Sequence, residues 1–170
     1  LLELHIAAEE TKYGLTLDAC RQLLEEGEWK EMKNLKNLFA GDEKNDVISY
    51  VAAIANMEGG HLVIGVQDKT LEIVGTDLSK FNLNAQSAVW KLLEHCTNLS
   101  SEGLSIDEYT TEDSHKTVWI IHIPKHLPRR PVYAHKKAWQ RVEDSLVEMT
   151  PERLAAILEE PVFEAKDWSA

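Results

Sequence analysis

Cationic side chains gather in one segment of the sequence, from Lys116 to Arg141, which contains no Asp or Glu. Tyr133 and Trp139 lie within the same segment. Lys and Arg neutralise the phosphates of nucleic acid, and aromatic rings can stack on its bases. The segment therefore indicates a surface that contacts nucleic acid. Its cations are Lys116, Lys125, Arg129, Arg130, Lys136, Lys137 and Arg141.

The charge of the rest of the chain supports a different interpretation. Because the segment contributes +7 to a net charge of −11, the remainder of the chain carries −18. A strongly acidic protein is not expected to bind nucleic acid indiscriminately. The cations could instead form a solvated loop that balances an acidic body. Composition alone leaves both interpretations open.

Other chemistries find no support in the residue patterns. The chain has no GxSxG motif, and neither Cys20 nor Cys96 has CxxC spacing or the histidine signature of a cysteine hydrolase. No histidine has zinc-ligand spacing with a cysteine. The Gly59-Gly60 pair lacks the order of a phosphate-binding loop and precedes a strand, so we interpret it as structural. We interpret three histidines as strand or surface residues rather than ligands: His61, His122 and His126.

The composition fits one globular domain, because 170 residues, 44% of them hydrophobic, are enough for a core. The chain has no apolar run of about 18 residues that would span a membrane, and it lacks the basic-then-apolar order of a signal peptide. The two cysteines are interpreted as reduced thiols of a cytoplasmic protein. We expect a lead-in segment at 1–14, the domain at 15–160, and the start of a linker or further domain at 161–170.

One continuous stretch is the centre of the predicted fold. A helix over 43–57 ends at Gly59-Gly60, and the strand His61–Val66 follows. This strand is apolar on both faces, as expected of a central strand. A tight turn at 67–70 leads into a second strand at 71–74.

Further helices and strands are predicted around this hairpin. The helices cover 15–26, 82–98 and the residues after Thr150, with Pro151 at the first helical position. The strands cover 28–34, 104–110, 117–123, 132–134 and 138–142. Asn82 or Asn84 is expected to cap the helix at 82–98. The residue pattern thus predicts alternating helices and strands with hairpins.

Seven short motifs follow one another along the chain. They are Glu31-Met32-Lys33, Ala53 to Gly60, Leu62 to Asp68, Gly75, Ile121 to Pro124, Pro131-Val132-Tyr133 and Trp139 to Val142. In this order they resemble the Schlafen-type AlbA-like domain. The resemblance implies an α+β fold with a mixed, largely antiparallel sheet and helices packed on it. It also implies a nucleic-acid partner, as for the bacterial transcriptional regulators that carry this domain at their N-terminus.

The resemblance further implies a carboxylate site, because some Schlafen proteins cut RNA with two Glu and one Asp. By the family's spacing the three would be Glu26, Glu31 and Asp68, with Glu28 as a nearer substitute for the first. Together they would hold Mg²⁺ or Mn²⁺, which activates water and neutralises the scissile phosphate. The alternative for Asp68 is a residue that favours the tight turn. Glu31 and Lys33 are two residues apart, so they share one face of a strand. Lys33 could there be a site lysine that meets phosphate, or the two residues could form a surface ion pair.

We favour a non-catalytic module that binds nucleic acid, DNA in particular, in a bacterial transcriptional regulator. A metal-dependent ribonuclease is the second hypothesis, and a protein-interaction or homo-oligomerisation module is the third. Tyr133 and Trp139 are interpreted as core residues, since positions of this kind flank short strands in the family. The residues expected to contact phosphates are Lys33, Arg129, Arg130, Lys136, Lys137 and Arg141.

Overall fold

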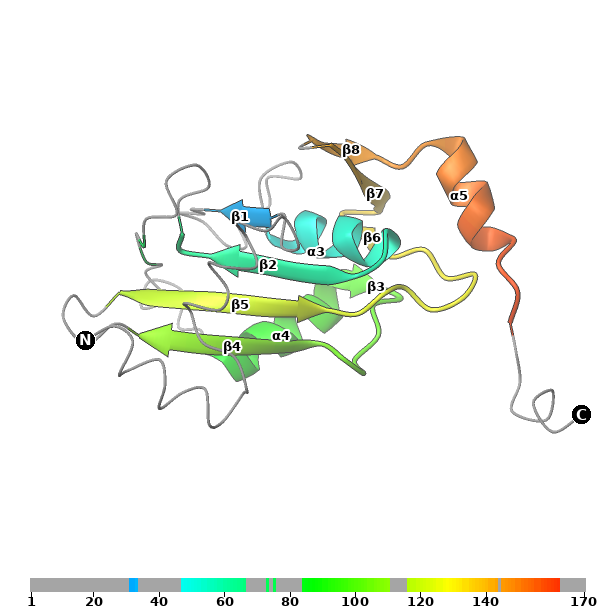
Figure 1. Cartoon of the computed structure of the whole chain (residues 1–170). Coiled ribbons are helices and arrows are strands. Elements are labelled where there is room, and N and C mark those ends of the chain that lie inside the picture. Colours follow the sequence, from blue (N-terminus) through cyan, green and yellow to red (C-terminus); the bar gives the residue numbers. More distant parts are fainter. Residues whose placement is uncertain are drawn as a thin grey trace, which may run out of the picture.

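The computed structural model describes residues 31–33, 47–66, 73, 75, 84–110, 116–143 and 145–162. The helices in this part of the chain are α3 (Val47–Asn56), α4 (Ala85–His95) and α5 (Pro151–Leu158). The strands are β1 (Glu31–Lys33), β2 (Gly60–Ile64), β3 (Cys96–Thr97), β4 (Ser105–Thr110), β5 (Thr117–Ile123), β6 (Tyr133–Ala134), β7 (Lys137–Val142) and β8 (Ser145–Glu148). They form two four-stranded sheets, so the fold is α+β, as predicted (Figure 1).

The first sheet has the strand order β1-β2-β5-β4. β1 is parallel to β2, whereas the β2–β5 and β4–β5 pairs are antiparallel. This is the mixed, largely antiparallel sheet that the family resemblance implies. Leu62, Val63 and Ile64 of β2 are all fully buried. Because successive residues of a strand point to opposite faces, both faces of β2 are covered, which confirms that it is a central strand.

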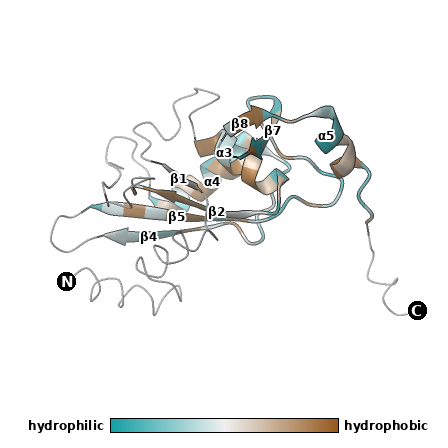
Figure 2. Ribbon diagram, turned by 45° about the horizontal axis from the view of Figure 1, so that its top comes forward, coloured by the Kyte–Doolittle hydropathy of each residue, from teal (hydrophilic) through white to brown (hydrophobic). Residues whose placement is uncertain are grey.

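Helix α3 lies between this sheet and the second one, whose strand order is β3-β6-β7-β8. Every residue of α3 is buried, as expected of a helix that is apolar all round. The core around it includes Leu62 and Ile121 from the first sheet, and Ala134 and Trp139 from the second. Figure 2 shows the hydrophobic colour in this middle layer and the hydrophilic colour on much of α5.

One buried polar side chain, Asn56 at the end of α3, joins the helix to the second half of the chain. Its amide nitrogen donates to the carbonyls of Val132 (2.8 Å) and Trp139 (2.9 Å). Its side-chain oxygen accepts from the Val132 amide (2.7 Å). Asn56 is fully buried, and these three bonds satisfy groups that would otherwise be unpaired. The Asn of the predicted motif is therefore structural.

Gly59 ends the α3 segment at a place where no side chain fits. Its φ is +75°, and an added Cβ would lie 2.7 Å from both the Ile123 carbonyl oxygen and the Lys125 amide nitrogen. Glycine supplies both the left-handed conformation and the close backbone approach. The structural interpretation of this glycine is confirmed.

Several predicted boundaries are also confirmed. Strand β5 covers 117–123, and α5 begins after the cap Thr150 with Pro151 at its first position. Helix α4 begins after Asn84, whose side chain accepts a hydrogen bond from the Ser87 amide (2.8 Å). This capping makes Asn84, rather than Asn82, the N-cap.

Two expectations for this region are wrong. The helix predicted to reach residue 98 ends at His95, because Cys96 has an extended backbone and pairs with Ala134 in the second sheet. A loop is also expected at 145–148, where β8 pairs with β7 instead. Both differences arise from pairing with distant segments, which local periodicity does not reveal.

Some predictions fall on residues outside the described ranges: the lead-in at 1–14, the helix at 15–26 with Cys20, most of the strand at 28–34, and most of 161–170. Ile73, from the predicted strand at 71–74, forms an isolated antiparallel bridge with Val66, as the predicted hairpin requires. Cys96 is a buried free thiol. In the described ranges, no helix is both long and apolar enough to cross a membrane.

Candidate nucleic-acid interface

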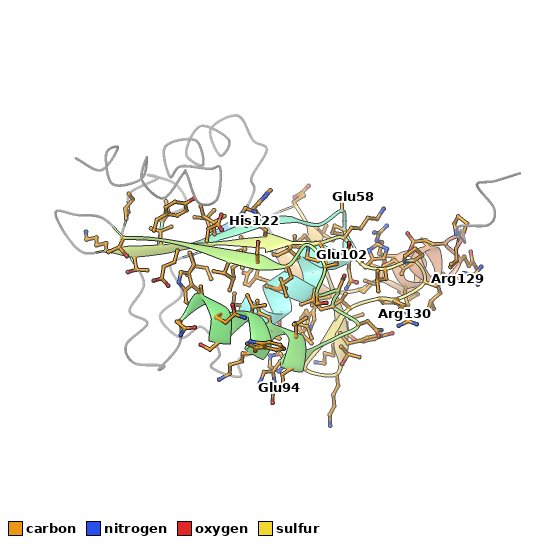
Figure 3. The ribbon with its side chains drawn as sticks, turned by 90° about the horizontal axis from the view of Figure 1, so that it is seen from below. Glu58, Glu94, Glu102, His122, Arg129 and Arg130 are labelled. Carbon is orange, nitrogen blue, oxygen red and sulfur yellow. The ribbon has the colours of Figure 1, made fainter. Side chains whose placement is uncertain are left out.

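The first exposed part of the basic segment is the loop between β5 and β6. The Arg130 amide donates to the Leu127 carbonyl (3.0 Å), which closes a β-turn with Pro128 and Arg129 in the middle. Arg129 has a φ of 63°, as the third position of a type II turn requires. Both arginines are exposed, and Figure 3 shows them at the end of the molecule that carries α5.

The second exposed part is the turn between β6 and β7. Ala134 pairs with Lys137, so His135 and Lys136 are the two turn residues. Both have positive φ angles, 52° and 65°, as in the type I′ turns that favour tight hairpins. Lys136 is exposed at this tip.

Two predicted phosphate-contacting residues lie against aromatic rings. The Lys137 ammonium is 5.9 Å from the centroid of the Trp139 ring, and the Arg141 guanidinium is 5.4 Å from that of Tyr50. Contacts of this kind attract a cation to the face of the ring. They fix the directions of these two side chains on the second sheet.

Arg130 and Lys136 are different, because the structure leaves their charged groups in solvent. Both side chains are exposed. Within the described ranges, neither side chain makes a hydrogen bond, an ion pair or a ring contact. These two cations therefore have the smallest cost of turning toward a phosphate.

The aromatic residues of the segment belong to the interior. Trp139 is 3% exposed, and its indole N–H donates to the Ala134 carbonyl (2.8 Å). Tyr133 is half-buried and packs against the small cluster formed by Ala138, Met149 and Ile157. The core interpretation is confirmed for Trp139, and Tyr133 lies at the edge of the core. Base stacking by Trp139 is excluded.

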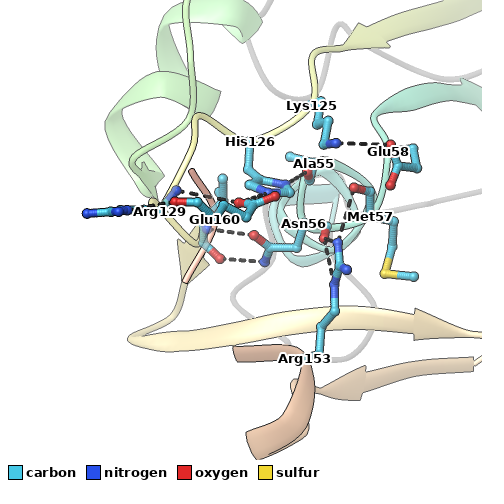
Figure 4. A network of polar contacts seen from close by, with 10 residues as sticks. Ala55, Asn56, Met57, Glu58, Lys125, His126, Arg129, Arg153 and Glu160 are labelled. Carbon is cyan, nitrogen blue, oxygen red and sulfur yellow. Dashed lines mark hydrogen bonds and ion pairs between the residues drawn. The ribbon is translucent and has the colours of Figure 1, made fainter. Parts of the chain in front are cut away.

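Helix α5 is fixed to the end of α3 by Arg153 (Figure 4). Its guanidinium donates to the carbonyls of Asn56 and Met57. The last carbonyls of a helix have no partner within it, and the helix dipole favours a cation there. Nothing in the sequence around Arg153 indicates this role, because it depends on how α5 packs.

A second contact joins the chain beyond α5 to the basic loop. The Glu160 Oε1 accepts hydrogen bonds from the His126 Nε2 (2.8 Å) and the Arg129 amide (3.4 Å). The Arg129 Nε donates to the Glu160 carbonyl (2.6 Å). The His126 side chain is fully buried, and its Nδ1 contacts the Ala55 carbonyl (2.9 Å). Interpreting His126 as a strand or surface residue is therefore wrong.

The surroundings of Glu160 favour its ionised form. Burial alone would raise the pKa of this carboxyl group. The hydrogen bond and charge of His126, the Arg129 amide and the nearby charge of Lys125 together outweigh burial and lower the pKa below its usual value. Lys125 also forms an exposed ion pair with Glu58 (3.2 Å).

The predicted carboxylate site is described only in part. Glu31 and Lys33 lie in β1, where the backbone register pairs them with Leu62 and Ile64 of β2. The other candidate ligands, Glu26, Glu28 and Asp68, lie outside the described residues. Within the described ranges, no group of three His, Cys, Asp or Glu residues is arranged to hold a metal ion.

A further group of titratable side chains spans three strands of the first sheet. The His122 Nε2 lies 2.8 Å from the Asp107 Oδ2, and the His61 ring meets the His122 ring edge-on with centroids 4.9 Å apart. Burial, followed by the charge of His122, lowers the pKa of His61 to about 4. His61 and His122 lie in strands, as predicted.

This arrangement predicts that acid destabilises the protein through His61. Its unfolded-state pKa of 6.5 lies above the folded value of about 4, so between these pH values the unfolded chain binds the proton more readily. The stabilisation is present above pH 6.5 and is lost on acidification. Because His61 is only half-buried, we expect a loss of about 1–2 kcal/mol. Urea unfolding at pH 7 and at pH 4.5 measures the free energy of unfolding that is lost on acidification. This loss should be smaller for His61→Gln than for the wild-type protein, and equal losses would contradict the role of His61.

The family of the chain follows from a match to the sequence model described as "Schlafen, AlbA_2", which covers residues 26–150. The chain belongs to this family. The match confirms the resemblance seen in the motifs and spans both sheets. In this Schlafen AlbA_2 domain, the motif residues Asn56 and Gly59 serve packing, and the two basic turns lie between the later motifs.

Among the solved structures that share the fold of the Schlafen AlbA_2 domain is one from a bacterium. It is the crystal structure of the DIP2311 protein from Corynebacterium diphtheriae, which is 18% identical with a TM-score of 0.56. The alignment covers 78% of this chain and 27% of that one, so the domain spans about a quarter of DIP2311. A comparison with curated protein sequences gives no match.

Proposed function

We propose that this Schlafen AlbA_2 domain binds nucleic acid through the cations of residues 116–141, with DNA as the favoured ligand. The observation that carries the proposal is the pair of exposed basic turns, one with Arg129 and Arg130 and the other with Lys136. Exposed cations on well-held turns can contact the phosphate backbone without a large loss of backbone freedom.

The support beneath these turns is rigid. Asn56 hydrogen-bonds to Val132, just after the first turn, and to Trp139, just after the second. Both turns are therefore fixed to the same buried side chain. A surface fixed in this way presents its charges at constant spacing, as binding to a regular backbone requires.

The finer role that we propose is a DNA-binding module of a cytoplasmic bacterial transcriptional regulator. Phosphate contacts set position and orientation but carry little sequence information. Recognition of particular bases would then come from other parts of such a regulator. Lys33, Arg129, Lys137 and Arg141 are the further phosphate contacts in this proposal.

Removing the two exposed cations whose side chains have no partner within the described ranges should weaken binding and its dependence on salt. We expect Arg130→Ala combined with Lys136→Ala to lower the slope of log affinity against log salt by about 1 to 2, since each lost phosphate contact removes about 0.9. Fluorescence anisotropy with labelled duplex DNA, single-stranded DNA and hairpin RNA over a range of salt concentrations measures this slope. Lys91→Ala on α4 controls for a change in charge outside the segment.

Two results would argue against the proposal. If the wild-type protein binds none of the three probes at low salt, a protein-interaction or oligomerisation module becomes the better account. If Lys91→Ala weakens binding as much as Arg130→Ala combined with Lys136→Ala, the phosphate contacts do not lie on these turns.

The second candidate is the metal-dependent ribonuclease, and the parallel pairing of β1 with β2 favours it. Lys33 pairs with Ile64, so the strand that contains Glu31 runs beside the strand that precedes Asp68. Gels of the same RNA samples with Mn²⁺ or EDTA test the activity. RNA shortened only with Mn²⁺, and left intact by Glu31→Gln, would support the ribonuclease. Intact RNA in every lane would remove it.

A further inference from the structure

The loop at 125–130 gathers hydrogen-bond donors and positive charge around Glu160, whose carboxylate and backbone carbonyl accept the hydrogen bonds. His126 is the buried member, and its Nδ1 faces the Ala55 carbonyl, which can only accept. Nδ1 therefore carries a hydrogen. Its Nε2 faces the Glu160 carboxylate at 2.8 Å. An ionised carboxylate can only accept, so the bonds to Ala55 and to Glu160 form together when both ring nitrogens carry a hydrogen.

Three more groups complete this arrangement. The Arg129 amide points to the same Glu160 oxygen (3.4 Å), and the Arg129 guanidinium contacts the Glu160 carbonyl (2.6 Å). The charge of Lys125 acts on the same carboxylate. A buried imidazole, a backbone amide, an arginine and a lysine form a donor set that suits any small oxyanion, a phosphate group included.

The same turn carries the arginines that we propose to contact nucleic acid. Figure 4 shows that Glu160 holds Arg129 through hydrogen bonds to its amide and its guanidinium. A carboxylate and a phosphate cannot accept from these donors at the same time. Any phosphate bound there must replace Glu160.

We propose that residues 125–130 form an oxyanion site, with the Glu160 carboxylate as its internal ligand and a nucleic-acid phosphate as the ligand that replaces it. The inference rests on the proposed function for the identity of the external ligand, but the site itself does not. Glu160 then acts as an intramolecular competitor that lowers the affinity of the basic surface. Its replacement would release the Glu160 side chain from the loop.

Helix α5 need not detach for this exchange. Arg153 fixes the helix to the last carbonyls of α3, and Ile157 is buried in the cluster with Ala138 and Met149. Glu160 lies beyond the last residue of α5. Only the few residues after the helix have to move.

The test compares Glu160→Gln with Glu159→Gln in the full chain. The two substitutions change the net charge equally, but Glu159 is exposed and contacts no donor of the loop within the described ranges. We expect Glu160→Gln to bind labelled duplex DNA or hairpin RNA about fivefold or more tightly than Glu159→Gln. Glu160→Asp, which keeps the charge on a shorter side chain, should give an intermediate affinity and serves if Glu160→Gln does not fold.

A second measurement uses inorganic phosphate as the probe, with ionic strength held constant by NaCl. In Glu160→Gln, phosphate should shift the NMR signals of the His126 ring and the Arg129 amide. These shifts should reach saturation as the phosphate concentration rises. In Glu159→Gln the same signals should need a much higher phosphate concentration. Equal behaviour of the two variants with both probes would overturn the oxyanion site.

The two proposals can fail separately. If Glu160→Gln takes up phosphate while no variant binds nucleic acid, the oxyanion site stands and the nucleic-acid function falls. If nucleic acid binds through Arg130 and Lys136 but Glu160→Gln and Glu159→Gln are alike, the function stands and the competition by Glu160 falls. If Glu160→Gln takes up phosphate but binds nucleic acid no more tightly than Glu159→Gln, the exchange is overturned.

Discussion

Replacing Asn56 with Ala should lower the free energy of unfolding by about 4 kcal/mol, a large part of the total for a domain of this size. The substitution leaves the Val132 amide and the carbonyls of Val132 and Trp139 without their hydrogen-bond partner in the core. Each unsatisfied buried group costs about 1–3 kcal/mol. Urea unfolding followed by tryptophan fluorescence measures the loss.

Asn84→Ala provides the matched control. Asn84 is an exposed N-cap with a single bond to the Ser87 amide and one from the Ser87 hydroxyl to its carbonyl. Losing the cap should cost about 1 kcal/mol. If the two Asn-to-Ala variants were destabilised equally, the buried bonds of Asn56 would not hold the second half of the chain as we describe.

Replacing Gly59 with Ala should destabilise the domain by at least about 3 kcal/mol, because strain and overlap add together. The new Cβ would meet backbone atoms of Ile123 and Lys125 at 2.7 Å, and neither can move without disturbing β5. We expect a lower midpoint of thermal unfolding and a smaller yield of folded protein. Circular dichroism during heating measures the midpoint.

Gly103→Ala separates these two effects. Gly103 has a similar left-handed φ of +86°, but its Cβ would meet only the Pro124 side chain, at 3.3 Å. It should therefore show the conformational strain alone, about 1–2 kcal/mol. A Gly59→Ala protein as stable as Gly103→Ala would mean that the backbone near Ile123 yields easily.

The sequence predicts the first sheet better than the second. The β2 strand is apolar on both faces, and α3 leads into it through Gly59, so local pattern and tertiary position agree. In the second sheet the strands are short. Cys96 continues an apolar helical stripe and yet pairs with Ala134, a contact between residues far apart in the sequence that no local pattern reveals.

The candidate site can also be predicted only in part from the sequence. Composition reveals the basic segment, and the strands predicted at 132–134 and 138–142 leave room for a turn between them. Composition does not reveal which cations are already engaged, such as Lys137 over Trp139, because this depends on packing. The role of Glu160 is hidden for the same reason: it meets His126 only after α5 folds back onto the end of α3.

The position of α3 has a consequence for how the domain opens. Both sheets use this helix as one wall of their interior, so the core between the two sheets belongs to both of them. Removing either sheet would expose one side of a helix with no polar face. Folding should therefore be cooperative across the two sheets, with the slowest hydrogen exchange at the amides of α3. Helix α5, which adds a single fully buried residue, Ile157, can open and close while the two-sheet unit stays folded.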